Sequence, residues 1–201
     1  MVRVWDPLVR VFHWSLVTGF VIAWLTAEEL SLLHEWSGYV IAGLIGLRLL
    51  WGLIGSHYAR FTQFVRGPGM VMNYLKALVT GREKRYLGHN PAGAAMIIAL
   101  LITLLATAYT GWLTANPTRL GVTAAPPSIV SSALADDDGD DDRRSGDKWV
   151  KEVHEALANL MLVLAGLHIG GIVLTSYRHR ENLARAMVTG NKRAAEPGDV
   201  F

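Results

Sequence analysis

The sequence predicts an all-α integral membrane protein, an antiparallel four-helix transmembrane bundle formed by one domain over residues 1–201. Three observations predict this class. Hydrophobic residues make up 51% of the chain and charged residues only 18%, against about 25% in soluble proteins. Four apolar stretches each approach the ~20 residues that cross a ~30 Å hydrocarbon core as a helix. The connections between them also alternate between acidic and basic, as expected when successive stretches cross a membrane. The four stretches are 8–27, 36–54, 92–113 and 153–175.

The first two stretches form a hairpin. The first begins among Arg3 and Arg10, lacks a small-residue cleavage site and leads directly into the second, so we expect a membrane span rather than a removable signal peptide. Three acidic residues lie at the connection between the two stretches. They are Glu28, Glu29 and Glu35.

The connection 55–90 is basic, with six Lys and Arg residues against the single acid Glu83. Apolar and basic residues surround Gly67-Pro68-Gly69 in the segment 62–79, which predicts a turn and a short amphipathic helix on the cytoplasmic surface. The third stretch starts at Asn90-Pro91, where asparagine is a good N-cap and proline suits the first helical position.

The connection 116–148 is rich in Pro, Ala, Ser and Asp, and we expect an acidic periplasmic loop, much of it mobile. Six aspartates lie within 135–142, where they could steer a basic partner or simply form a solvated loop. The tail after the fourth stretch is basic again. By the positive-inside rule, both termini and the connection 55–90 are cytoplasmic. The basic residues therefore reflect topology, and we expect no nucleic-acid partner.

Histidine is the candidate metal ligand, because the chain has no cysteine for thiolate sites or covalent haem attachment. Four of the seven histidines lie in or at the ends of the apolar stretches: His13, His34, His154 and His168. Fourteen residues separate His154 from His168. As helical positions they lie about 21 Å apart along the axis and about 40° from a common direction, so both project from nearly one face.

Matching the depths of the four histidines pairs His34 with His154 on the outer side and His13 with His168 on the inner side. Two stacked bis-histidine sites suit two b haems, because haem iron can take two axial imidazoles while the porphyrin lies in an apolar slot. Each histidine taken alone could instead be an ordinary interhelical hydrogen-bonding group.

Arg48 is a charged residue within an apolar stretch, where a charge is costly to place in a membrane. It follows His34 by fourteen residues, which puts it at the depth of the inner pair. Its guanidinium could pair with a haem propionate. Alternatively, it could extend to the cytoplasmic interface, since the second stretch ends about six residues later.

Four segments in order resemble the bacterial cytochrome b561 family, in its branch related to the cytochrome b subunit of nickel–iron hydrogenases. They are VRVWDPLVRVFHW, LHEWSGYVIAGLIGLRLLWGLIGSHYARF, YLGHNPAGA and VHEALANLMLVLAGLHIGGI. The resemblance covers about 1–115 and 148–193 and leaves out the acidic stretch 124–147. It implies a four-helix bundle in the bacterial inner membrane that binds two b haems and exchanges electrons with quinone. It also implies the same four ligands: His13, His34, His154 and His168.

His57 and His89, at the cytoplasmic ends of the stretches, are weak candidates for a quinone headgroup, with Tyr58 and Arg60 as neighbours. Interfacial polar residues at such positions are more often anchors or caps.

The function that these observations favour is electron transfer between the quinone pool and a redox partner, such as a periplasmic cytochrome c. Whether the chain is a simple carrier or an oxidoreductase subunit stays open, since a membrane anchor of a hydrogenase or other dehydrogenase would use the same haems. A haem-free transporter or scaffold is a further alternative. An optical spectrum separates it from the haem proteins.

Overall fold

The computed structural model describes residues 1–29, 31–115 and 141–200. This part of the chain is mostly helical, which confirms the all-α class. The elements in order are β1 (Val2–Arg3), α1 (Pro7–Leu25), α2 (Ser31–Ile54), the 3-10 helix η1 (His57–Ala59), α3 (Phe61–Phe64), α4 (Pro68–Thr80), α5 (Pro91–Ala115), α6 (Asp141–Arg178), α7 (Leu183–Thr189) and β2 (Asn191–Lys192).

Within the described residues, four helices are long and apolar enough to cross a membrane: α1, α2, α5 and the part of α6 from Lys148 to Arg178. Their surfaces are apolar as well. Leu53 is 70% exposed, Ile102 62% and Val173 62%. Continuous exposed apolar surface of this kind is matched by lipid rather than by water. The chain is a multi-pass membrane protein.

The start of α6 differs from the sequence prediction. The acidic loop was expected to reach 148 and the fourth stretch to begin at 153, but the helix begins at Asp141. Hydropathy detects only the apolar part of a helix, and no proline interrupts 141–153, so polar turns extend the helix beyond the span. The rest of the acidic loop, 116–140, lies outside the described residues. Helix α2 likewise begins at Ser31, so His34 lies within it.

Short polar side chains fix where the long helices begin. Asp6 caps α1 by accepting a hydrogen bond from the backbone N–H of Val9 at 2.9 Å, with Pro7 at the first helical position. The other carboxylate oxygen of Asp6 accepts from Trp51 Nε1 at 3.3 Å and from the Ser56 hydroxyl. The start of α1 is therefore tied to the end of α2. Asn90 caps α5 in the predicted way, accepting from the Gly93 N–H at 2.7 Å.

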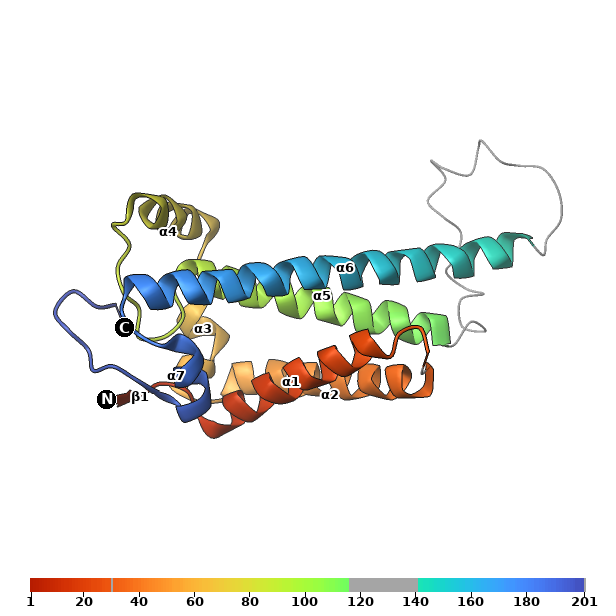
Figure 1. The fold of residues 1–201 in the computed structure, drawn as a ribbon, viewed down its shortest axis with the longest axis horizontal. Coiled ribbons are helices and arrows are strands. Elements are labelled where there is room, and N and C mark those ends of the chain that lie inside the picture. The colour runs from red at the N-terminus through yellow and green to blue at the C-terminus, as the bar shows by residue number, and fades with distance from the viewer. Residues whose placement is uncertain (30, 116–140, 201) are drawn as a thin grey trace.

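The four long helices lie side by side (Figure 1). Helix α2 packs against α1 and α5, and α5 packs against α6. The start of α1, the end of α2, the start of α5 and the end of α6 lie at one end of the molecule, together with α4, α7 and both chain termini (Figure 1). We call this the terminal end.

All four long helices contribute to one apolar layer midway along their length. Ile41 and Ile45 of α2, Leu104 of α5 and Met161 of α6 are its buried residues. Four partly buried side chains pack against them: Leu16, Phe20, Ala23 and Leu100. This layer is the reference level for the site residues described below.

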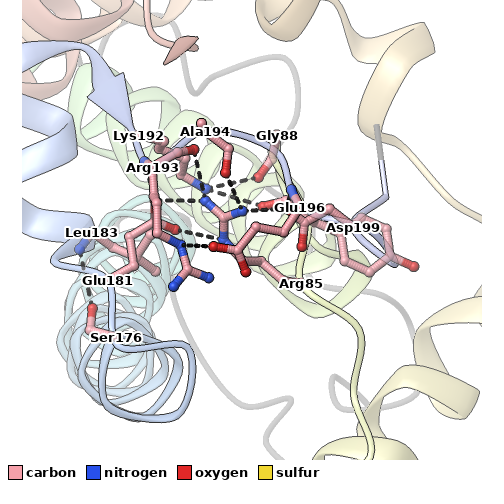
Figure 2. A network of polar contacts seen from close by, with 11 residues as sticks. Arg85, Gly88, Ser176, Glu181, Leu183, Lys192, Arg193, Ala194, Glu196 and Asp199 are labelled. Atoms are coloured by element: carbon pink, nitrogen blue, oxygen red, sulfur yellow. Dashed lines mark hydrogen bonds and ion pairs between the residues drawn. The ribbon is translucent and has the colours of Figure 1, made fainter. Parts of the chain in front are cut away.

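Long-range contacts close the terminal end. Strand β1 pairs with β2 in antiparallel register, joining the two ends of the chain. Arg85 contacts the carboxylates of Glu181, at 2.9 Å, and Asp199, and it donates to the backbone carbonyls of Arg193 and Ala194 (Figure 2). These three charged side chains are only 5–8% exposed. We refer to this group as the Arg85 network.

Candidate functional site

His34 and His154 face each other from α2 and α6. The centres of their rings lie 6.0 Å apart and the ring planes are nearly perpendicular, at 83°. Both side chains are half-buried. Ala23, whose carbonyl contacts His34, belongs to the apolar layer, and this pair lies on the side of that layer away from the terminal end.

Backbone carbonyls orient both rings. The Nδ1 atom of His34 lies 2.8 Å from the Ala23 oxygen, and the Nδ1 atom of His154 lies 3.0 Å from the Thr107 oxygen. A carbonyl can only accept, so each Nδ1 carries the proton and each Nε2 keeps a free lone pair. This is the tautomer in which a histidine binds a metal through Nε2 while its other nitrogen is held in place.

Helix α5 approaches His154 closely. The Thr110 hydroxyl lies 3.2 Å from Nδ1 of His154. A Cβ atom at Gly111 would lie 2.9 Å from Cε1 of His154, closer than real Cβ atoms come to a neighbour. Gly111 therefore makes room for the imidazole, and the sequence interpretation missed its role.

His13 and His168 lie nearer the terminal end, on α1 and α6. Both are half-buried. The Nδ1 atom of His13 is buried without a hydrogen-bond partner among the described residues. Met161 of the apolar layer is seven residues from His154 and seven from His168. The layer therefore separates the two histidine levels.

Arg48 is 4% exposed and does not reach the surface. One of its terminal nitrogens donates to the Ala59 carbonyl at 3.0 Å, and its guanidinium carbon lies 5.0 Å from the centre of the Phe61 ring and 5.9 Å from that of Phe64. No carboxylate pairs with it among the described residues. Its remaining donors could serve an anion brought by a cofactor.

His57 and His89, the predicted quinone candidates, line one small pocket at the terminal end. Its volume is about 20 Å³, roughly the room for one water molecule. Tyr58 lines it as well, whereas Arg60 instead donates to the Gly55 carbonyl at 2.7 Å. A quinone ring would need this pocket to widen.

His89 lies between two aromatic rings, with its centre 4.5 Å from that of Trp5 and 4.6 Å from that of Phe64. Burial lowers the pKa of His89 to about 3, and the positive charges of Arg48 and Lys192 add to this effect. His89 is therefore neutral at physiological pH, whereas His57 is exposed. Lys192 lies 5.7 Å from the Trp5 ring, and burial lowers its pKa to about 8.

Several of these groups could not be identified from local sequence. Thr107, Thr110 and Gly111 precede the histidine that they contact by more than forty residues. Their only signal is helical spacing, since positions 107, 110 and 111 share one face of α5. Nothing in the local sequence indicated that Trp5 and Lys192 lie close together. They meet only because segments far apart in the sequence pack together at the terminal end.

The pair of His34 and His154 fits a haem better than a bare metal ion. Among the described residues, no three His, Cys, Asp or Glu side chains gather as a metal site would require. Two imidazoles suffice for haem iron, because the porphyrin supplies the other ligands. Bonds of about 2.0–2.1 Å from a metal to two imidazoles place the ring centres roughly 6 Å apart. The 6.0 Å separation of His34 and His154 agrees with this value.

The family model described as prokaryotic cytochrome b561 matches residues 4–190. Searches among curated proteins and among solved structures give no significant match. The matched range includes all four long helices and the four histidines that they carry. Proteins of this family bind b-type haem and exchange electrons with redox partners such as quinones and other electron-transfer proteins. With its four apolar helices, the chain belongs to the prokaryotic cytochrome b561 family and is a membrane b-type cytochrome that acts in electron transfer.

Proposed function

We propose that this protein is an antiparallel four-helix bundle with two b haems that carries electrons between the quinone pool and a redox partner protein. His34 and His154 would hold the iron of the outer haem, and His13 and His168 that of the inner haem. The observation that carries the proposal is the outer pair, with ring centres 6.0 Å apart and both Nδ1 atoms bonded to carbonyls.

Each haem iron, when bound, supplies a one-electron couple between ferric and ferrous states. The side chains would hold the iron and set its reduction potential. The hydrogen bonds from His34 to Ala23 and from His154 to Thr107 fix the ring orientation and make Nε2 a stronger donor. With two histidines holding each haem, the iron would have no place for a substrate, which favours electron transfer over catalysis at the metal.

The inner level has a different electrostatic environment. Arg48 is buried near the end of α2, and we infer that its guanidinium pairs with a propionate of the inner haem. A positive charge close to an iron stabilises its reduced form. We therefore infer that Arg48 raises the potential of the inner haem relative to a variant that lacks the charge.

The terminal end is cytoplasmic in this proposal, and the protein lies in the bacterial inner membrane. The basic connection 55–90 and the basic tail meet at this end, as the positive-inside rule requires. The pocket of His57 and His89 is then the cytoplasmic candidate for a quinone headgroup. His57 is the exposed one of the two histidines and therefore the more accessible to a quinone headgroup. A His57→Ala variant with intact haem and normal quinol turnover would remove that candidate.

The redox partner on the periplasmic side belongs to one of two classes. A soluble cytochrome c would be reduced by the purified protein in a salt-dependent reaction, because charge steers such encounters. A dehydrogenase or hydrogenase subunit would instead copurify with the protein as a large metalloenzyme.

Haem content tests the proposal. The purified protein should show a reduced α-band and about two haems per chain. His34→Ala and His154→Ala should each remove one and the same haem, and His13→Ala and His168→Ala the other. A protein without Soret absorption would end the proposal, and a variant pair that removes different haems would overturn the assignment of ligands.

A further inference from the structure

A groove lies between the first turns of α1 and helix α7, apart from both histidine pairs. Its volume is about 370 Å³, which is in the range of small-ligand sites. Six residues line it: Pro7, Arg10, Val11, Trp14, Ser15 and Val188. It is far larger than the pocket of His57 and His89.

Arg10 supplies the charge in this groove. One terminal nitrogen of Arg10 donates to the Val188 carbonyl at 2.6 Å. Its Nε atom is buried and has no hydrogen-bond partner among the described residues. No carboxylate of those residues forms an ion pair with Arg10. A cation without a counter-ion favours an anion, and the Arg10 side chain lines the groove in which an anion would bind.

Five of the six lining residues lie in the first turns of α1, where the headgroups of a membrane crossed by this helix are expected. Arg10 lies in the first turns of a membrane-spanning helix, where interfacial arginines occur. Three apolar side chains form the rim: Val11 is 66% exposed, Trp14 44% and Val188 58%. Tryptophan is itself typical of the interface between headgroups and acyl chains.

We propose that this groove binds the headgroup of an anionic phospholipid. The phosphate accepts hydrogen bonds from the Arg10 guanidinium, with the Ser15 hydroxyl as a second polar group, and the acyl chains follow the apolar surface of Val11 and Trp14. The cation favours an anion over a neutral ligand such as a quinone. The Trp14 ring stands edge-on to the ring of His13 at 5.2 Å, so the lipid lies beside the inner histidine level. The proposal does not depend on haem being present.

Lipid retention measured by native mass spectrometry tests the site on the whole purified protein. Phosphatidylglycerol, phosphatidylcholine and inorganic phosphate are added in separate titrations. The wild type should retain one phosphatidylglycerol in preference to phosphatidylcholine and should not retain free phosphate. One basic residue at an anionic surface contributes roughly fivefold in affinity, so Arg10→Gln should weaken phosphatidylglycerol retention by about that factor.

Two further variants separate binding from folding. Arg185→Gln removes the same charge from an exposed position on α7 outside the groove and should leave retention unchanged. Ser15→Phe fills the groove while keeping the bond from Arg10 to Val188, and it should also weaken retention. Equal retention by the wild type and Ser15→Phe would overturn the proposal, as would equal binding of the two lipids. Displacement of the lipid by a quinone analogue would assign the groove to quinone instead and would likewise overturn it.

Discussion

Gly111 has the most direct steric relation to a proposed haem ligand. A methyl group at this position would meet the imidazole of His154 at 2.9 Å from Cε1 and 3.3 Å from Nδ1. Gly111→Ala should therefore displace His154 and destabilise the outer site by about 1–3 kcal/mol, as overpacking does. Electron paramagnetic resonance of the oxidised protein should show one haem signal changed and the other intact.

The control for this experiment is Gly69→Ala on α4, where a new Cβ would have no neighbour within 4 Å. Both haem signals should stay as in the wild type. An unchanged spectrum in Gly111→Ala would show that His154 does not depend on this close approach.

His89 should make stability depend on acid pH. Burial, with the charges of Arg48 and Lys192, lowers its pKa to about 3 from an ordinary value of 6.5. Between these values the unfolded chain binds a proton that the folded chain does not, so stability falls as the pH falls below about 6.5. His89→Gln should flatten this loss by up to about 1.4 kcal/mol per pH unit. Thermal unfolding at a series of pH values measures it.

The exposed His57 provides the control. His57→Gln should leave the loss of stability at acid pH as it is in the wild type. If the wild type and His89→Gln lost stability equally as the pH fell below about 6.5, His89 would not be buried and neutral.

Part of the site could be anticipated from residue spacing. The rise of a helix, together with the span directions indicated by the charged connections, places His34 and His154 at one depth, and their rings lie 6.0 Å apart. The surroundings of His89 could not be anticipated, because its neighbours Trp5 and Phe64 are far from it in sequence. Arg48 is intermediate: its depth followed from spacing, but the choice between surface and interior required the position of Ala59.

At the level of elements, the Arg85 network attaches the C-terminal tail to the connection before α5. Arg85→Gln would leave the carboxylates of Glu181 and Asp199 buried without their partner, and breaking a buried ion pair costs about 3–5 kcal/mol. We expect a lower unfolding temperature and faster proteolysis of the tail after β2. Mass analysis of the fragments locates the cleavage.

The exposed pair of Arg193 and Glu196 is the matched control, since its side chains are 42% and 57% exposed. Arg193→Ala should change stability by less than about 1 kcal/mol. If both variants lost the tail to proteases at the same rate, the Arg85 network would not be what holds the tail.

The predictability of an element follows from the range of the forces that form it. The four long helices were predictable because apolar composition acts along each of them, and the cap at Asn90 is local. The start of α6 was not predicted, because its first turns are polar and hydropathy does not detect them. Strands β1 and β2 are two residues each and pair across almost the whole chain, so no local pattern indicates them.

At the scale of the molecule, the apolar layer lies between the two histidine levels. Every buried residue in it is an aliphatic side chain or methionine. These four buried side chains offer no hydrogen-bonding partner to ions or water, while an electron needs none. The layer therefore favours electron transfer over a polar transport path between the two histidine levels.

The orientation in the membrane gives the last prediction, and the absence of cysteine makes it accessible to labelling. Thr80→Cys on α4, Glu196→Cys in the tail and Glu28→Cys in the first hairpin all replace exposed residues. The first two lie at the terminal end and should react with an impermeant maleimide only in inverted vesicles. Glu28→Cys should react only in right-side-out spheroplasts. The reverse pattern would put the basic end outside and refute the positive-inside assignment, whereas labelling of Thr80→Cys and Glu196→Cys from different sides would refute a terminal end on one side of the membrane.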